Sequence, residues 1–335
     1  MLVRLLQLSL FIPVLILAFG PLWALAEDRE KKALTVEQVS PANRFDNGRK
    51  WAILIGVNTY LDPKIRNLKY CASDVQLMQK VLIEKCGYEK RRILLISDAQ
   101  EKLERKPLRI NMMEQTRLWL SHAQAGDTVL IFFSGHGFLD KQGEGYLAPT
   151  DCLKRNLPLS AFRTNELRKM LDNCYASQKL LILDCCNAGA KGGEDGSSGQ
   201  EVGAEFAQAR GLITLASCKK DEQSEEWDKK GQGLFTWFLT EGLGGKADKD
   251  KNGIVDSDEL YRYTSDEVPL APLVEENQLT GAKPQHPVRM IGPDVVGVFG
   301  LSRVAIRPQR ELRTSKIEMA SPKMELRSNT ALLDV

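Results

Sequence analysis

Histidine is scarce in this sequence of 335 residues, and neither sign of charge predominates. The three histidines are His122, His136 and His286, so a His-rich metal site is excluded and few candidates for a general base remain. Lys and Arg number 46 and Asp and Glu 44, and the net charge of +2 gives no electrostatic basis for binding nucleic acid. A Gly-x-Ser-x-Gly elbow and a phosphate-binding Gly-rich Lys-Ser/Thr loop are both absent, which disfavours the hydrolases and nucleotidases built on those motifs.

Long apolar runs are also lacking, except at the N-terminus. After Arg4, the stretch 5–19 is almost wholly apolar, and Ala24-Leu25-Ala26 then precedes a charged run. This run is short for a membrane-spanning helix and fits a secretory signal peptide over residues 1–26. We therefore expect an exported protein, periplasmic or extracellular, with membrane association only if this segment stays uncleaved as an anchor. Export permits disulfides, but seven cysteines cannot all be paired within one chain.

The body of the chain alternates short apolar runs with segments of helical spacing. Hydrophobic residues make up 43% and charged residues 27%, as in an ordinary globular domain. The alternation predicts an α/β fold with a mostly parallel central sheet and helices on both faces. We expect a polar linker over 27–46, one domain over 47–300 with a long flexible loop at 188–203, and a disordered, polar and basic tail over 301–335. The predicted strands are 51–57, 93–96, 128–133, 180–183 and 212–216, and the predicted helices are 72–82, 110–123, 164–171 and 234–239.

Two of the predicted strands end in residues that carry chemistry. One runs into Ser134-Gly-His-Gly137 and the other into Asp184-Cys-Cys-Asn187. Active sites of open parallel sheets form at the carboxyl ends of strands, where an imidazole can activate a thiol. Alternation along a strand would place Cys185 in the core and Cys186 at the site. The alternatives are a hydrogen-bonded histidine in a tight turn and a buried or disulfide-linked cysteine.

These residues resemble the two signature motifs of the caspase-like cysteine peptidases, and most of all the metacaspase branch in a bacterial-type, exported form. His136 precedes Cys186 by about 50 residues, the spacing of the caspase pattern. The resemblance, which extends to Gly233-Leu-Phe-Thr236, implies a caspase-hemoglobinase fold and peptide hydrolysis by a Cys186/His136 dyad without an organic cofactor. It also implies an oxyanion hole made by the backbone N–H groups of Gly137 and Cys186.

Two acidic residues match the positions at which metacaspases hold a basic substrate side chain. These are Asp74, in Cys71-Ala-Ser-Asp74, and Asp184. Carboxylates lining a slot favour Arg or Lys through charge-assisted hydrogen bonds. Asp74 could instead be the N-cap of the helix that follows it. Asp184, at the end of an apolar strand, requires a partner in either case.

A separate twelve-residue segment fits an EF-hand calcium loop. Oxygen ligands fall at positions 1, 3, 5, 9 and 12, glycine stands at position 6, and position 7 would ligate through its carbonyl. The alternative is a polar loop that joins two helices, and glycines at 242, 244 and 245 interrupt the entering one. The predicted ligands of Ca²⁺ are Asp248, Asp250, Asn252, Ile254, Asp256 and Glu259.

The sequence departs from metacaspases at Asn187, where they carry histidine, and at Thr164-Asn-Glu-Leu167, where they carry an acidic calcium-linked segment. We therefore do not transfer calcium activation. The prediction is a cysteine endopeptidase that cleaves protein or peptide substrates after Arg or Lys and processes itself at Lys191 or Arg210. The alternatives are a catalytically weak caspase-like scaffold and a calcium-responsive binding protein.

Overall fold

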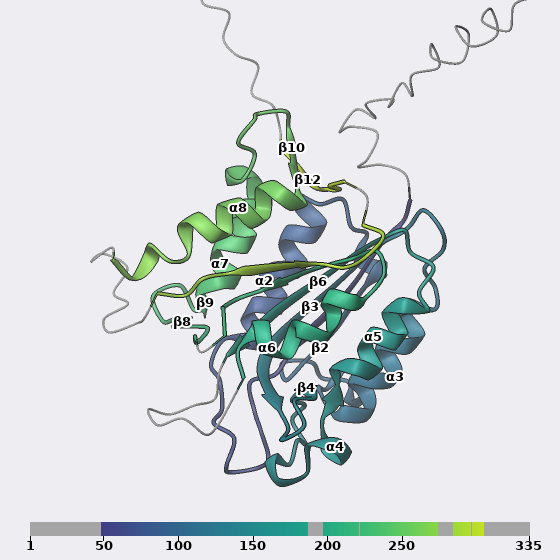
Figure 1. Cartoon of the computed structure of the whole chain (residues 1–335), viewed down its shortest axis with the longest axis vertical. Helices are drawn as coiled ribbons and strands as arrows, with labels where there is room; N and C mark the ends of the chain where they lie inside the picture. The colour runs from purple at the N-terminus through teal and green to yellow at the C-terminus, as the bar shows by residue number, and fades with distance from the viewer. Residues whose placement is uncertain (1–47, 187–196, 221, 274–283, 296, 305–335) are drawn as a thin grey trace, which may run out of the picture.

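The structure is a computed structural model that describes residues 48–186, 197–220, 222–273, 284–295 and 297–304, apart from the side chain of Cys186. Figure 1 shows a central sheet lying between two layers of helices. The strands are β1 (Lys50–Gly56), β2 (Ile93–Ser97), β3 (Thr128–Leu139), β4 (Gly145–Leu147), β5 (Phe162–Arg163), β6 (Gln178–Cys186), β7 (Leu212–Ala216), β8 (Glu226–Trp227), β9 (Gln232–Gly233), β10 (Ile254–Asp256), β11 (Val288–Ile291) and β12 (Gly300–Arg303). The helices are α2 (Cys71–Glu84), α3 (Arg109–Leu120), α4 (Leu157–Ser160), α5 (Thr164–Asp172), α6 (Gly199–Gly203), α7 (Leu234–Glu241) and α8 (Ser257–Glu267).

The main sheet has the order β11-β7-β6-β3-β1-β2, with β4 and β5 added beyond the end of β3. The strands from β7 to β2 are parallel, and only β11 joins this path antiparallel, against β7. All the parallel strands therefore point their carboxyl ends to one edge. This confirms the predicted α/β class with a mostly parallel sheet.

Alternation along the strands sorts the core into two layers. On β1, Ile53 and Ile55 pack with α3 and α5, whereas Ala52 and Leu54 pack with α2 and α7. Both faces of these strands are buried, which explains why the strands appear in the sequence as continuous apolar runs. Figure 1 shows α3 and α5 on one side of the sheet and α2, α7 and α8 on the other.

Two predicted boundaries are too short because polar or glycine-rich residues continue a strand. β3 runs through the Ser-Gly-His-Gly motif to Leu139, since the motif pairs with β6 on one side and with β4 beyond. The fold also continues past residue 300, because β12 pairs with β10 and buries Leu301 and Ser302. The remainder of the predicted tail, like residues 1–47, lies outside the described residues.

The predicted long loop over 188–203 contains a helix in its described part. Ser198 caps α6 by accepting the backbone N–H of Glu201, and the Glu201 carboxylate accepts the N–H of Ser198 in return. Two glycines bring this helix close to the sheet. A Cβ at Gly203 would lie 3.0 Å from Leu183 Cδ1, and one at Gly199 would lie 3.3 Å from the Ala216 Cβ. These glycines serve close packing rather than flexibility.

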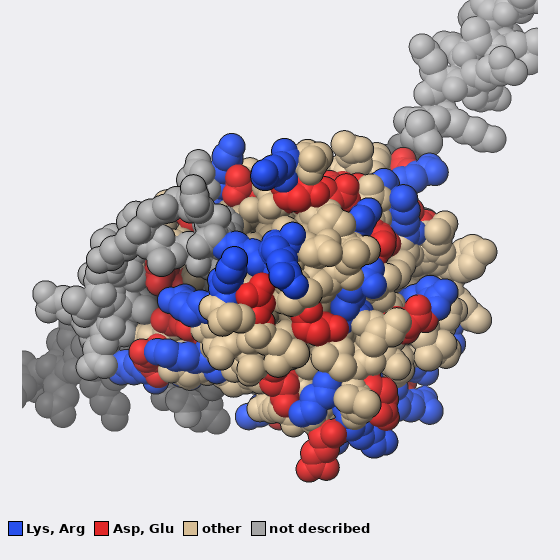
Figure 2. Space-filling model, turned by 90° about the horizontal axis from the view of Figure 1, so that it is seen from below, with Lys and Arg blue, Asp and Glu red and all other residues tan. Residues whose placement is uncertain are grey.

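The surface shown in Figure 2 intersperses basic and acidic side chains, in keeping with the near balance of charge in the sequence. None of the helices in the described part of the chain is long and apolar enough to cross a membrane.

Candidate active site

Two neighbouring strands bring the predicted dyad together. In the parallel pairing of β3 with β6, His136 lies directly opposite Cys186, and Ser134 lies opposite Asp184. Cys185, as predicted, is fully buried in the core layer of α3 and α5. The Cys186 side chain is outside the described part of the structure. Its backbone nevertheless places it at the last position of β6, beside the histidine.

His136 is held by two contacts from the loops that follow β1. Its Nε2 lies 2.7 Å from the carbonyl oxygen of Arg66, which can only accept, so Nε2 carries a proton. In the neutral ring, the basic nitrogen is therefore Nδ1. The Tyr60 ring packs against the imidazole at 4.9 Å between centroids, and the Tyr60 hydroxyl accepts the backbone N–H of His136. His136 is thus oriented within a strand, and the alternative of a histidine in a tight turn is wrong.

The two acidic residues predicted for the substrate pocket lie together. Both are 2% exposed. A Cβ built on Gly233 would lie 2.9 Å from Asp184 Oδ2 and 3.1 Å from Asp74 Oδ2, so the two carboxylates flank the same glycine. A side chain at residue 233 would press on both, which explains the glycine at the end of β9.

Each carboxylate is surrounded by neutral hydrogen-bond donors. Asp74 accepts the Gly233 N–H at 2.8 Å and the Ser134 hydroxyl at 2.9 Å. Asp184 accepts the hydroxyls of Ser224 at 2.5 Å and Thr236 at 2.6 Å. These bonds satisfy oxygens that would otherwise be costly to bury.

Burial raises the pKa of both carboxyl groups, and the charge of Asp184 raises the pKa of Asp74 further. The bonds from Gly233, Ser134, Ser224 and Thr236 oppose this rise. A positive charge placed beside the two groups would lower both pKa values.

The N-cap alternative for Asp74 is wrong. Helix α2 begins at Cys71 with Tyr70 as its N-cap, so Asp74 lies in the first turn. Its carboxylate accepts from Gly233 and Ser134, which belong to other elements. The carboxylate is therefore bonded to β3 and β9 rather than capping its own helix.

Comparison with known proteins assigns the family. The caspase-domain family matches residues 49–289, which is more than half of the chain. The chain belongs to the caspase-domain family. Within it, the chain resembles metacaspases, being 34% identical to metacaspase-1 of Schizosaccharomyces pombe over 29% of this chain and 23% of that protein. It is 25% identical to metacaspase-3 of Arabidopsis thaliana over 58% of each chain. The chain therefore spans less than two thirds of these relatives.

The fold agrees with this assignment. The crystal structure of caspase-1 from Spodoptera frugiperda superposes with a TM-score of 0.51 at 12% identity, covering 79% of this chain and 94% of that one. The predicted caspase-hemoglobinase fold is confirmed. The caspase domain here places the predicted dyad and both acidic residues on the carboxyl-end side of the sheet.

Several residues at the site were not anticipated. Ser134 and Thr236 stand in segments that carry the family resemblance, but nothing in their spacing assigns them to the acidic residues. Ser224 has no motif at all. The carbonyl of Arg66 is a backbone group, so no residue type signals its role. Only the folded caspase domain brings these partners to the site.

Gly137, one of the two predicted oxyanion donors, lies one residue beyond the position that pairs with Cys186. Gly137 follows His136 in β3, and its carbonyl accepts the backbone N–H of Ser197 at 3.2 Å. A Cβ at Gly137 would lie 2.6 Å from Val202 Cγ2, because α6 packs against this point. The glycine is needed for that close approach and does not turn the chain. The roles of the Gly137 and Cys186 N–H groups remain predictions.

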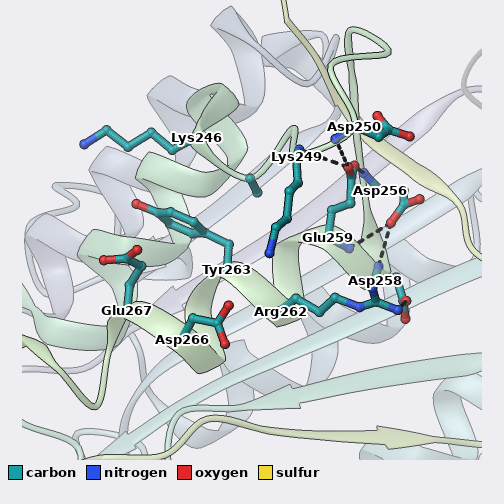
Figure 3. Close-up of a pocket in the computed structure, with 11 residues that line it drawn as sticks. Lys246, Lys249, Asp250, Asp256, Asp258, Glu259, Arg262, Tyr263, Asp266 and Glu267 are labelled. Carbon is teal, nitrogen blue, oxygen red and sulfur yellow. Dashed lines mark hydrogen bonds and ion pairs between the residues drawn. The ribbon is translucent and has the colours of Figure 1, made fainter.

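The predicted calcium loop lies between α7 and α8 in the chain, and Figure 3 shows several of its side chains. Carboxylate oxygens of Asp248, Asp250 and Glu259 lie within 4.8 Å of one another. Gly253, at the position where the loop turns, has φ of +83°. Asp256 caps α8, accepting the N–H groups of Asp258 and Glu259. The side chains from positions 1, 3 and 12 thus converge, whereas the carboxylate at position 9 caps the helix.

Proposed function

We propose that this protein is a cysteine endopeptidase that cleaves protein or peptide substrates after Arg or Lys. The observation that supports it best is the buried Asp74/Asp184 pair, which flanks Gly233 beside the strands that carry His136 and Cys186. A peptidase needs a nucleophile, a base and a pocket that selects the residue before the cleaved bond. All three fall on neighbouring elements of one sheet edge.

The chemistry follows from the orientation of His136. With Nε2–H held by the Arg66 carbonyl, Nδ1 is the nitrogen that would take the thiol proton of Cys186. The thiolate then attacks the carbonyl carbon, and the protonated imidazole donates its proton to the departing amine. The N–H groups of Gly137 and Cys186 would stabilise the tetrahedral oxyanion. Water then hydrolyses the acyl-enzyme.

The preference for a basic side chain follows from charge. Asp74 and Asp184 receive only neutral donors in the described residues, so the pocket holds acid without a paired cation. An Arg guanidinium can bond both carboxylates through its fixed fork of N–H groups, whereas Lys offers a compact ammonium. An acidic side chain would be repelled.

The test is hydrolysis of fluorogenic peptides that end in Arg, Lys or Asp, using protein that begins at residue 27. Cys186→Ala and His136→Ala should abolish cleavage, and Cys185→Ala, the matched control, should retain the catalytic thiol. Cleavage after Arg and Lys but not after Asp is the expected result. Cleavage after Asp would overturn the specificity and keep the dyad.

The alternative of a catalytically weak scaffold predicts a folded protein that hydrolyses none of these peptides. The alternative of a calcium-responsive binding protein predicts partner binding that chelation abolishes, again without hydrolysis. Both are tested in the same assay by adding calcium or a chelator.

We also propose that residues 248–259 bind Ca²⁺. The donors fit the ion, because calcium takes carboxylate and carbonyl oxygens, and Asp248 Oδ1 is a buried oxygen without a hydrogen-bond partner among the described residues. Asp248, Asp250, Asn252 and Glu259 would hold the ion with side-chain oxygens, Ile254 with its carbonyl, and Asp256 directly or through water. Bound calcium would neutralise the repulsion between these carboxylates.

Calorimetric titration of the metal-free protein with CaCl₂, with MgCl₂ as a control, tests this site. One binding event per chain, lost in Asp250→Asn combined with Glu259→Gln, is expected. Absence of heat and of any rise in thermal midpoint with calcium would refute it.

Self-processing, if it occurs within one molecule, should take place at Lys191 rather than Arg210. Arg210 precedes β7, whose first residue Leu212 pairs with Lys179 near the start of β6. Cys186 lies at the other end of β6, on the order of 20 Å away at about 3.3 Å per residue. Lys191 lies outside the described residues. Loss of the cut in Cys186→Ala and in Lys191→Ala, but not in Arg210→Ala, is the expected outcome.

We propose, finally, that the chain is exported after cleavage following Ala26. The support is the charge and apolar pattern of residues 1–26. N-terminal sequencing of the protein recovered from its native compartment should begin at Glu27, whereas an intact Met1 would favour the anchor.

A further inference from the structure

Gln285 lies far from His136 and Cys186 in the sequence but is linked to Asp184 through Ser224 in the structure. It is fully buried, just before β11. Its Nε2 donates to the Ser217 carbonyl at 2.8 Å and to the Ser224 hydroxyl at 3.1 Å. Its Oε1 accepts the Glu225 N–H at 2.9 Å. Every polar group of the side chain is thus used.

These bonds fix the direction of the Ser224 hydroxyl. A serine hydroxyl has a single hydrogen, and its oxygen here accepts from Gln285. The hydrogen is therefore left for Asp184 Oδ1, 2.5 Å away. An ionised Asp184 can only accept, so this arrangement matches the form of the carboxylate that would bind a cation.

Gln285 also joins a rigid element to a connecting segment. Ser217 follows β7 in the main sheet, and β11 pairs with that strand. Ser224 and Glu225 belong to the segment that leads to β8. At the start of β8, the Glu226 carboxylate accepts the backbone N–H groups of Lys69 and Tyr70. The segment thus runs from Gln285 to the start of α2, the helix that carries Asp74. It contacts Asp184 through Ser224 and the start of α2 through Glu226.

We propose that Gln285 is a positioning residue for substrate specificity: it holds Ser224 so that the serine hydroxyl donates to Asp184 and keeps that carboxylate aimed at a basic side chain. This inference rests on the proposed preference for Arg and Lys. It adds to that proposal a residue that touches neither the substrate nor the dyad.

The test is a double-mutant cycle between Gln285→Met and Ser224→Ala, measured on an Arg peptide. Methionine keeps the length of the side chain and removes its donor and acceptor groups. Gln285→Met should raise KM about tenfold with kcat within about twofold, since a hydrogen bond to a charged group is weakened rather than a catalytic group removed. In the Ser224→Ala background, the same substitution should raise KM by less than about twofold.

Two controls separate positioning from a general loss of structure. Gln200→Met removes another side-chain bond, from the Lys220 N–H, that does not reach Asp184, and it should leave KM unchanged. If Gln285→Met does not fold, Gln285→Glu takes its place, because it keeps the shape and an acceptor for Glu225 N–H but lacks the Nε2 donor.

The second measurement does not depend on turnover. NMR of carbon-13-labelled aspartate in the Cys186→Ala protein follows the titration of Asp184, which should move to higher pH in Gln285→Met than in the parent. Additive effects on KM together with an unmoved Asp184 titration would overturn the inference. If the wild type cleaves no basic peptide, the proposed specificity fails, while the Asp184 titration still decides the role of Gln285.

Discussion

Two groups of carboxylates in this molecule differ in their burial and in the origin of their hydrogen-bond donors. Asp74 and Asp184 are buried at the carboxyl end of the sheet, and their donors come from β3, β9, α7 and the segment before β8. Asp248, Asp250 and Glu259 lie at the surface within twelve consecutive residues, and their donors are backbone N–H groups and the Asn252 amide of the same loop.

The difference teaches what each group can bind. Burial raises the pKa of Asp74 and Asp184. A cation that binds this pair must therefore leave water, as the charged end of a substrate side chain would. In the loop, burial raises the pKa of Glu259 too, but solvent still reaches the carboxylates, as a hydrated ion requires. The first group is therefore a specificity pocket and the second a metal loop in our proposals.

The largest expected effect is a loss of catalysis when the buried pair is altered and the loop is left intact. Asp184→Asn should lower kcat/KM for Arg peptides about 100-fold or more, because an entering guanidinium loses a buried charged partner. Calcium affinity should be unchanged, since the loop shares no residue with the pocket. Peptide kinetics and calorimetry on the same preparation measure both. A parallel fall in calcium affinity would show that the two groups are coupled.

A third buried carboxylate, that of Asp127, differs from the other two because it forms an ion pair with Arg49. Asp127, at the opposite end of β3, accepts from Arg49, the Trp51 indole and the Gln124 N–H. Burial alone would raise the pKa of Asp127, but these bonds hold it below its usual value. Asp127→Asn should therefore destabilise the fold by about 2 kcal/mol at pH 7, as urea unfolding would show. The loss should disappear as the pH falls through the folded-state pKa, and KM should not change.

In the loop, Glu259→Gln should weaken calcium binding about tenfold or more, because the residue at position 12 supplies a bidentate carboxylate. Asp266→Asn, which removes the same charge two turns along α8, is the matched control and should leave affinity within about twofold. Calorimetric titration distinguishes the two. Equal losses would mean that only the overall charge of the region attracts the ion.

The smallest effect is a gain in stability. Asp74→Asn should stabilise the protein at pH 7 by about 1 kcal/mol, because it removes one of two buried like charges and the amide can keep the bonds to Gly233 and Ser134. Cleavage after Arg should fall in the same variant. Urea unfolding measures the gain in stability, and the peptide assay measures the fall in cleavage. A loss of stability would show that the ionised pair is stabilising in the free protein.

The pH dependence of that gain has a definite sign. The pKa of Asp74 is raised by folding, so the folded wild type binds more protons than the unfolded chain between about pH 4 and the higher folded-state pKa. Wild-type stability from this group therefore falls as pH rises through that window. The advantage of Asp74→Asn should grow from pH 4 to pH 7 and vanish below about pH 4.

Features that depend on residues close in the sequence were predictable, and features that depend on tertiary contacts were not. The pattern of apolar runs located the strands of the parallel sheet, and β7 was predicted to the residue. The strand alternation separated Cys185 from Cys186. By contrast, the glycines of the His136 motif and of α6 suggested turns and flexibility, since a sequence does not show the neighbour that a Cβ would strike. Val202 and Leu183 are those neighbours.

What the sequence by itself determined is therefore the fold class, the pairing of a histidine with a cysteine at strand ends, and the order of the acidic residues in the predicted calcium loop, because each depends on periodicity or on contiguous residues. Only the tertiary structure decided that Asp74 bonds β3 and β9 instead of capping α2, that Ser224 and Thr236 donate to Asp184, and that Gln285 donates to Ser224. Those partners come from separate elements, and their hydrogen bonds exist only after the sheet and its helices have packed.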